Sequence, residues 1–78
     1  MLLMYKKENL MREQVFWRKI SRIILLLAEH LNVSPKRAMD LFYNTQVCSM
    51  LHDRRTGLFL MSDLYIVHDT LSELQNRQ

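Results

Sequence analysis

The strongest periodic pattern in the chain is an apolar stripe between Asn9 and Leu31. Large apolar residues recur there every three or four positions, the spacing that places side chains on one face of an α-helix. Polar residues fall largely on the other face, so the pattern predicts a helix over residues 9–31. The stripe consists of Phe16, Ile20, Ile23, Ile24, Leu27 and Leu31, and the opposite face carries Arg12, Lys19, Arg22 and Glu29.

The second half of this predicted helix is apolar on more than one side. Four further apolar residues widen the stripe: Trp17, Leu25, Leu26 and Ala28. A helix that is apolar over most of its circumference is expected to be covered on several sides. The cover comes either from the protein's own core or from a second subunit.

A sharp corner follows at Asn32-Val33-Ser34-Pro35. Asn tolerates the left-handed conformation that ends helices, Ser caps helix N-termini, and Pro suits the first helical position. A second helix is therefore predicted over Pro35–Asn44, with Ala38, Leu41 and Phe42 facing inward. A short helical segment through Val47, Cys48, Met50 and Leu51 is expected after it.

The last third of the chain contains a turn, a short apolar run and a final helix. Asp53-Arg54-Arg55-Thr56-Gly57 predicts an exposed turn. Leu58–Met61 fits either a buried extended segment or a short strand that needs a partner. Ser62 caps a predicted helix over Asp63–Leu74. Its apolar stripe is Leu64, Val67, Leu71 and Leu74, widened by Tyr65 and Ile66.

These elements predict a mostly all-α fold, a small bundle of three to four helices with a short extended segment near residues 58–61. Seventy-eight residues correspond to one domain, 1–78, close to the lower size limit for a single hydrophobic core. The chain has only one Gly and one Pro, the residues that most often mark turns and loops, and this also favours long helices. Residues 1–8 are expected to be disordered.

Charge, cysteine content and the length of apolar runs indicate the compartment in which the protein is expected. Residues 1–22 carry six basic side chains against two acidic ones, whereas the rest of the chain is close to neutral. A single cysteine, Cys48, cannot form an internal disulfide and fits a reducing compartment. The longest apolar run, Ile23–Ala28, is far shorter than a membrane span requires. We therefore expect a cytoplasmic protein that does not enter a membrane.

Candidate catalytic chemistry is sparse. His30, His52 and His68 fall on three different segments without the close spacing of a helical metal motif, and no cysteine pair completes a zinc site. Gly57 stands alone, which excludes a glycine-rich phosphate loop. The sequence predicts no catalytic residue, no metal or cofactor and no small-molecule substrate. The protein is therefore not expected to be an enzyme.

One interpretation is a helix-turn-helix over residues 24–43. Ala28 takes the small position where two helices cross, and Asn32 takes the turn position. The stretch Leu27–Lys36 resembles the helix-turn-helix of bacterial transcription regulators. Lys36, Arg37 and Tyr43 would then face the DNA major groove. Only two cations lie on the candidate recognition helix, and Asp40 between Arg37 and Tyr43 would repel phosphate, so DNA binding is the alternative interpretation.

The preferred interpretation is a protein-interaction module that associates with itself. Apolar stripes on the first and last helices exceed what a chain of this size easily covers. The predicted interaction face, which is equally a predicted core, consists of Phe16, Ile20, Ile24, Leu27, Leu31, Phe42 and Leu71.

A resemblance spans roughly residues 15–74. It rests on Leu27–Ser34, Ala38, Asp40–Tyr43, Leu51-His52 and Tyr65–Asp69. In these positions the chain resembles a group of short uncharacterised bacterial proteins, a domain of unknown function found mainly in gut Bacteroidetes and Firmicutes. Some of them are encoded beside larger proteins related to ADP-ribosyltransferases, so the resemblance implies an accessory or antitoxin-like partner. No functional residue is transferred, because the group has no established site.

Overall fold

The fold is seen in a computed structural model, which describes the backbone of residues 2–77 and the side chains of residues 13–77. Within the described backbone there are four α-helices and no strand, so the predicted all-α class is confirmed. The helices are α1 (Leu2–Leu31), α2 (Pro35–Tyr43), α3 (Gln46–His52) and α4 (Asp63–Asn76). Two short 3₁₀ helices, η1 (Arg54–Thr56) and η2 (Leu58–Leu60), join α3 to α4.

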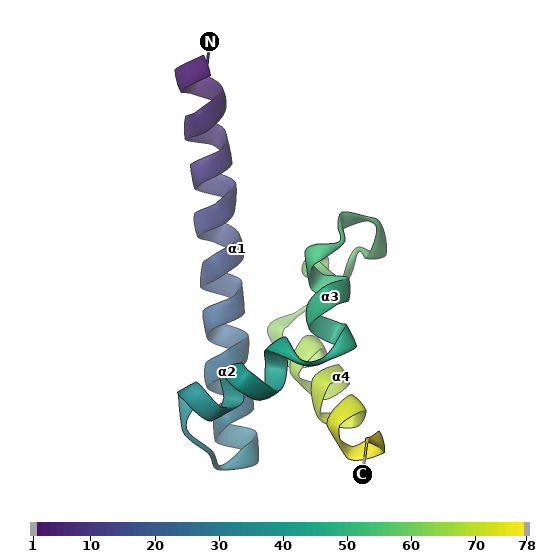
Figure 1. Cartoon of the computed structure of the whole chain (residues 1–78). Helices are drawn as coiled ribbons and strands as arrows, with labels where there is room; N and C mark the ends of the chain where they lie inside the picture. The colour runs from purple at the N-terminus through teal and green to yellow at the C-terminus, as the bar shows by residue number, and fades with distance from the viewer. Residues whose placement is uncertain (1, 78) are drawn as a thin grey trace.

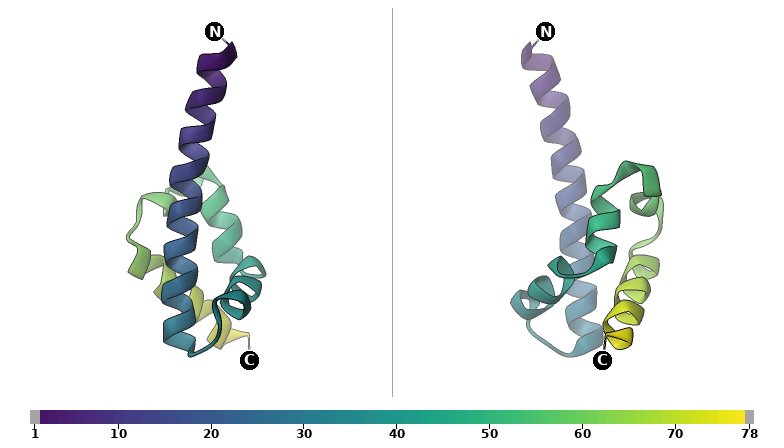
Figure 2. Two further views of the ribbon diagram at one scale, coloured as in Figure 1. Left: turned by 90° about the vertical axis from the view of Figure 1, so that its left-hand side faces the viewer. Right: turned by 45° about the vertical axis from the view of Figure 1, so that its right-hand side comes forward.

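The helix α1 is the longest element, and the others pack on one side of it. Figure 1 shows α2 crossing the C-terminal end of α1, with α3 and α4 beyond it, while the first turns of α1 extend past the remaining helices. The left view of Figure 2 looks onto α1 with all other elements behind it. The long helix accounts for the elongated outline, 50 × 26 × 19 Å.

The corner between α1 and α2 has the predicted chemistry. Asn32 adopts the left-handed conformation with φ 56°. The amide of Val33 donates to the carbonyl of Ala28 at 3.0 Å and that of Asn32 to Glu29 at 3.3 Å, the two bonds of a Schellman motif. The Ser34 hydroxyl accepts from the amide of Arg37 at 3.1 Å and caps α2. The corner is therefore fixed by local hydrogen bonds.

The expected extended segment at Leu58–Met61 is wrong. Leu58–Leu60 form the 3₁₀ helix η2, and only Met61 has extended backbone angles. Gly57 at φ 69° redirects the chain, and the amide of Met61 donates back to the carbonyl of Leu58 at 3.0 Å. No strand lies in the described backbone to pair with the run, so it satisfies its own backbone groups in a tight turn.

The buried side chains form one apolar cluster between α1 and the other helices. Its members come from α1, α2, α3, η2 and α4. The largest side chains that are fully buried are Phe42, Ile20, Ile23, Leu27, Ile66, Val67 and Thr70. The hydroxyl of Thr70 donates to the carbonyl of Ile66 at 2.8 Å, which satisfies this polar group inside the core.

The buried faces of α1 and α4 differ in detail from the predicted apolar stripes. Lys19, predicted on the polar face of α1, is buried, whereas Trp17 and Leu25, predicted to widen the apolar stripe, are half exposed. On α4 the buried face is Ile66, Val67 and Thr70, so the stripe is rotated away from Leu64, which is exposed. Leu64 precedes Ile66 by two residues, a spacing that puts the two side chains on different sides of a helix.

The observed ends of two helices also differ from the predicted ends. The helix α1 begins at Leu2 rather than near Asn9, and α4 ends at Asn76 rather than Leu74. Residues 2–8, for which disorder was expected, lie in the first turns of α1, and Met1 lies outside the described backbone.

Candidate functional site

The predicted interaction face lies within the protein's own core. Ile20, Ile24, Leu27 and Phe42 are buried, and Phe16, Leu31 and Leu71 pack against the buried cluster as partly exposed residues. The structure brings all seven together, as expected for a core. Because they contact one another within a single chain, they do not offer a free surface to a partner.

An ion cluster fastens the start of α4 to α1. The Lys19 ammonium donates to Asp63 Oδ1 and to the carbonyl of Met61, each at 2.9 Å, and Arg22 Nε donates to Asp63 Oδ2 at 2.8 Å. The hydrogen bond from Arg22, and then the bond and charge of Lys19, lower the pKa of the Asp63 carboxyl from 3.8, against an opposing effect of burial. The Lys19 charge, although buried, is therefore paired and hydrogen-bonded.

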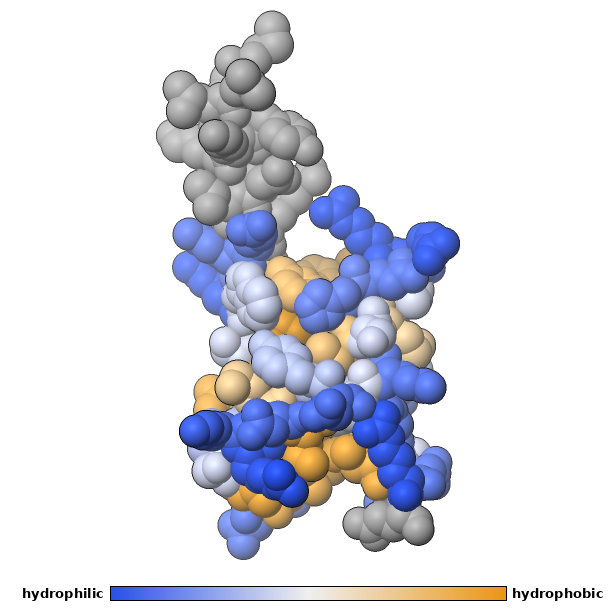
Figure 3. Space-filling model, viewed as in Figure 1, coloured by the Kyte–Doolittle hydropathy of each residue, from blue (hydrophilic) through white to orange (hydrophobic). Residues whose placement is uncertain are grey.

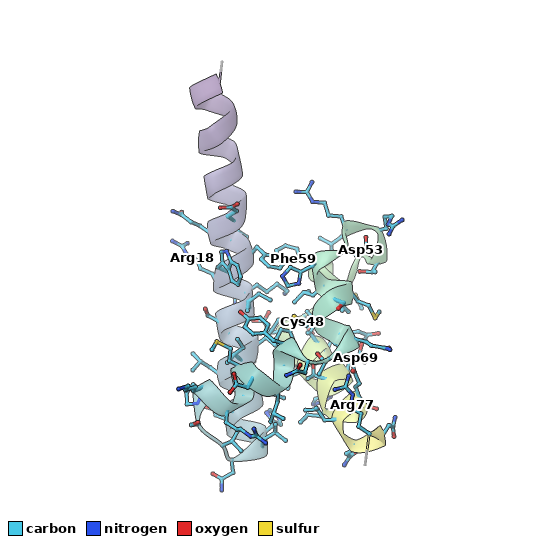
Figure 4. All side chains as sticks on the ribbon, in the orientation of Figure 1. Arg18, Cys48, Asp53, Phe59, Asp69 and Arg77 are labelled. Atoms are coloured by element: carbon cyan, nitrogen blue, oxygen red, sulfur yellow. The ribbon has the colours of Figure 1, made fainter. Side chains whose placement is uncertain are left out.

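An aromatic group continues this junction toward α3. The Phe16 ring lies 5.8 Å from the Phe59 ring in a stacked arrangement and 4.8 Å from the His52 ring edge to face. The Lys19 ammonium sits 5.6 Å from the centre of the Phe59 ring, within range of a cation–π contact. Figure 4 shows Phe59 reaching from η2 toward α1, with Asp53 at the far tip of the same connection. The segment before α4 is thus held on both sides.

The same segment carries four exposed apolar residues, among them Leu60, the most exposed large apolar residue of the described chain. Leu60 is 86% exposed, Leu64 53%, Tyr65 46% and Met61 40%. We call these four side chains the corner patch. Leu64 and Tyr65 lie in the first turn of α4, and Leu60 and Met61 end the connection just before it. Figure 2 (left) shows the yellow-green chain that joins η2 to α4 at an outer edge of the molecule.

Sequence reasoning missed this patch. It assigned Leu58–Met61 to a buried or paired segment and placed Leu64 in the buried stripe of α4. No local signal marks it, because a solvated aspartate at position 63 would leave the rotation of α4 open. In the structure Asp63 pairs with Lys19 and Arg22 of α1, and Leu64 and Tyr65 remain exposed.

The solvent face of α2 carries the residues predicted to contact DNA. Lys36, Arg37, Asp40 and Tyr43 are exposed, while Ala38 and Phe42 anchor the helix in the core. Figure 3 shows hydrophilic side chains crossing the face of the molecule at the level of α2, with apolar side chains visible between the helices. The geometry thus presents two cations, one anion and an aromatic ring to solvent.

Two of the three histidines converge. The rings of His30, in the last turn of α1, and His68, on α4, lie 6.2 Å apart, whereas His52 packs on Phe16 elsewhere. The pair lines an open groove together with Leu31, Leu71, Ser72, Leu74 and Gln75. Among the described side chains, no group of three or more His, Cys, Asp or Glu residues could hold a metal ion.

The single cysteine is buried rather than poised to react. Cys48 is a free thiol in the core, and desolvation by burial raises the pKa of that thiol from 9.0. A raised pKa lowers the thiolate fraction at neutral pH, so nucleophilic chemistry at this position is disfavoured.

Comparison of the chain with protein-family models, with curated proteins and with solved structures gives no match. Within the described residues, none of the helices combines the length and the apolar character needed to cross a membrane.

Proposed function

We propose that the protein is a non-enzymatic protein-interaction module that associates with itself through the corner patch. The observation that carries this proposal is the exposure of four large apolar side chains within six consecutive residues, Leu60 to Tyr65. Contiguous exposed apolar side chains mark interaction surfaces in soluble proteins, whereas scattered ones do not.

The backbone beneath the patch is anchored to α1. Lys19 holds the carbonyl of Met61 and the carboxylate of Asp63, and Phe59 packs against Phe16. A surface fixed by such contacts loses little conformational entropy on association. This supports a role as a preformed docking surface.

A second copy of the chain is the partner that the charge distribution favours. Asp63 is the only charged residue between Leu60 and Tyr65, and its carboxylate is paired with Lys19 and Arg22 of α1. Two copies can therefore bring this patch together without opposing two unpaired carboxylates at the centre. A two-fold interface of this kind uses the same surface on both subunits.

The accessory or antitoxin-like role implied by the resemblance remains part of this proposal. In that role the corner patch would bind a larger partner protein in place of a second copy.

The test replaces exposed leucines with a charged residue. Leu60→Glu and Leu64→Glu should each convert the self-associated protein to a monomer, measured by light scattering after size exclusion. Leu25→Glu is the matched control for Leu64→Glu, because Leu25 is 55% exposed against 53% for Leu64 but lies on α1, outside the corner patch. Loss of association in the control, or its persistence in both corner variants, would contradict the proposal.

DNA binding is the second candidate function. The favouring observation is that α2 presents Lys36, Arg37 and Tyr43 outward while Ala38 and Phe42 fix it against α1, the arrangement a recognition helix needs. Binding to duplex DNA should then weaken steeply as salt rises, and Lys36→Ala with Arg37→Ala should flatten that dependence. Absence of binding at low salt removes this candidate.

A further inference from the structure

The His30–His68 pair joins two elements that are far apart in sequence. His30 lies in the last turn of α1 and His68 in the middle of α4, and both rings are exposed at the edge of the groove between these helices. Their ring centres are 6.2 Å apart with an interplanar angle of 77°. We infer that these two histidines form a binding site for a divalent first-row transition metal ion, such as nickel, copper or zinc.

The hydrogen bonding of His30 leaves one of its ring nitrogens free to bind a metal. The Nδ1 of His30 lies 2.9 Å from the carbonyl of Leu26, and since a carbonyl only accepts, Nδ1–H is the donor. In the neutral ring, Nε2 then carries the free lone pair. A backbone carbonyl on the second nitrogen is the arrangement that fixes the tautomer and direction of metal-binding histidines in proteins.

The separation of the rings is close to what a shared metal requires. With metal–nitrogen bonds of about 2.1 Å and tetrahedral angles, two ligating imidazoles have centres roughly 5 Å apart. The observed 6.2 Å therefore has to shrink by roughly 1 Å on binding, which small rotations of two exposed side chains provide.

The surroundings favour a cation. His30 lies one residue before the end of α1, where the negative end of the helix dipole attracts positive charge. Among the described residues that line the groove, none is Lys or Arg. Ser72 and Gln75 line the same groove, and water completes the coordination of the ion.

Metal binding at this site would clamp the C-terminal end of α1 to α4. The two ligands come from residues 30 and 68, which are close only in the folded chain. A ligand that binds the folded state alone raises its stability. His68 lies one turn after Leu64 and Tyr65 on α4, so the metal titration is run at a protein concentration at which the chain is monomeric.

The experiment is a calorimetric titration of the untagged protein with nickel chloride in a non-coordinating buffer. The expected result is one nickel ion per chain, with affinity reduced about tenfold or more in both His30→Ala and His68→Ala, because each variant loses the second ligand's effective concentration. His52→Ala is the matched control and should bind as the wild type does. Its own Nδ1 lies 2.8 Å from the carbonyl of Cys48, the same bond within a helix that His30 makes.

The thermal midpoint and the binding stoichiometry are two further readouts of the site. Nickel should raise the thermal midpoint of the wild type and of His52→Ala but not of His30→Ala or His68→Ala, all checked for helical content by circular dichroism. Unchanged binding in either groove variant, or loss of binding in His52→Ala, would overturn the site. A stoichiometry of one nickel ion per two chains would overturn it as well, since the metal would then bridge copies.

Discussion

Asp63 is the residue on which the junction between α1 and α4 depends. Its carboxylate accepts from Lys19 and Arg22, whose side chains are 11% and 56% exposed. The buried Lys19 pair contributes more than the exposed Arg22 pair, because surface ion pairs are screened by solvent. Removing the carboxylate also leaves the Lys19 charge unpaired in the core.

Asp63→Asn should therefore lower the free energy of unfolding by about 3 kcal/mol at neutral pH, the magnitude expected when one partner of a largely buried ion pair is lost. Urea unfolding measures this difference. The pKa of the Asp63 carboxyl is lower in the folded protein than the ordinary value of 3.8. Its contribution to the free energy of unfolding is therefore complete above pH 3.8 and is lost as the pH falls through the pKa of the folded state. The gap between wild type and variant should consequently close below pH 3.8.

Asp53→Asn is the matched control for that prediction. The bond to Arg55 also lowers the pKa of the Asp53 carboxyl, but the Arg55 side chain is 90% exposed and the pair spans only two residues. Its replacement should change stability much less than Asp63→Asn does. An equal loss in the two variants would mean that burial of Lys19 is not what makes Asp63 important.

At the scale of elements, α3 shows how a very short helix is stabilised by tertiary contacts. Seven residues are too few to form a stable helix alone. Thr45 caps its first turn, and the carboxylate of Glu73 on α4 accepts from the amides of Gln46 at 2.7 Å and Val47 at 3.0 Å. A negative group at this end also suits the helix dipole.

Glu73→Gln should cost about 1–2 kcal/mol of stability and speed hydrogen exchange in α3, because one oxygen acceptor and the charge are lost at a helix N-terminus. Arg77→Ala removes only the exposed partner of Glu73 and should have a small effect. Equal exchange rates in α3 for Glu73→Gln and wild type would show that Thr45 alone is sufficient.

Two neighbouring leucines on α1 test its orientation. Leu27 is fully buried and Leu25 is more than half exposed. Leu27→Ala should reduce the free energy of unfolding by about 2–5 kcal/mol, the cost of emptying a core position. Leu25→Ala should change it by less than about 0.5 kcal/mol. Thermal or urea unfolding compares the two, and similar losses would contradict the assigned buried face.

Elements with their own local signals were predictable from the sequence. The corner at Asn32–Pro35 and the caps Ser34 and Ser62 depend on residues next to them in the chain, and the structure confirms all of them. The rotation of α4 and the burial of Lys19 were not predictable, because they depend on a pairing across 44 positions. For the same reason the sequence could not distinguish the exposed residues of the corner patch from core residues. The apolar spacing was sufficient to group the seven residues of the predicted interaction face, which lie in or against one buried cluster.

For the whole molecule, one apolar cluster supports a chain whose longest helix extends beyond it. A domain of this size has a stability of only about 5–10 kcal/mol, so single core substitutions remove a large share of it. Burial of the corner patch against a second copy would add apolar contact that the monomer lacks. Self-association and stability should therefore be linked.

That linkage predicts a thermal midpoint that rises with protein concentration in the wild type and not in Leu60→Glu. Scanning calorimetry over a wide concentration range measures it. A concentration-independent midpoint in the wild type would contradict the predicted link between association and stability.

The proposed self-association is tested most directly by sedimentation velocity from low micromolar to several hundred micromolar protein. The weight-average mass should rise from that of the 9.5 kDa chain toward twice that value in the wild type, and should stay at the monomer value in Leu60→Glu and Leu64→Glu. A wild-type mass that remains at 9.5 kDa over the whole range would contradict it.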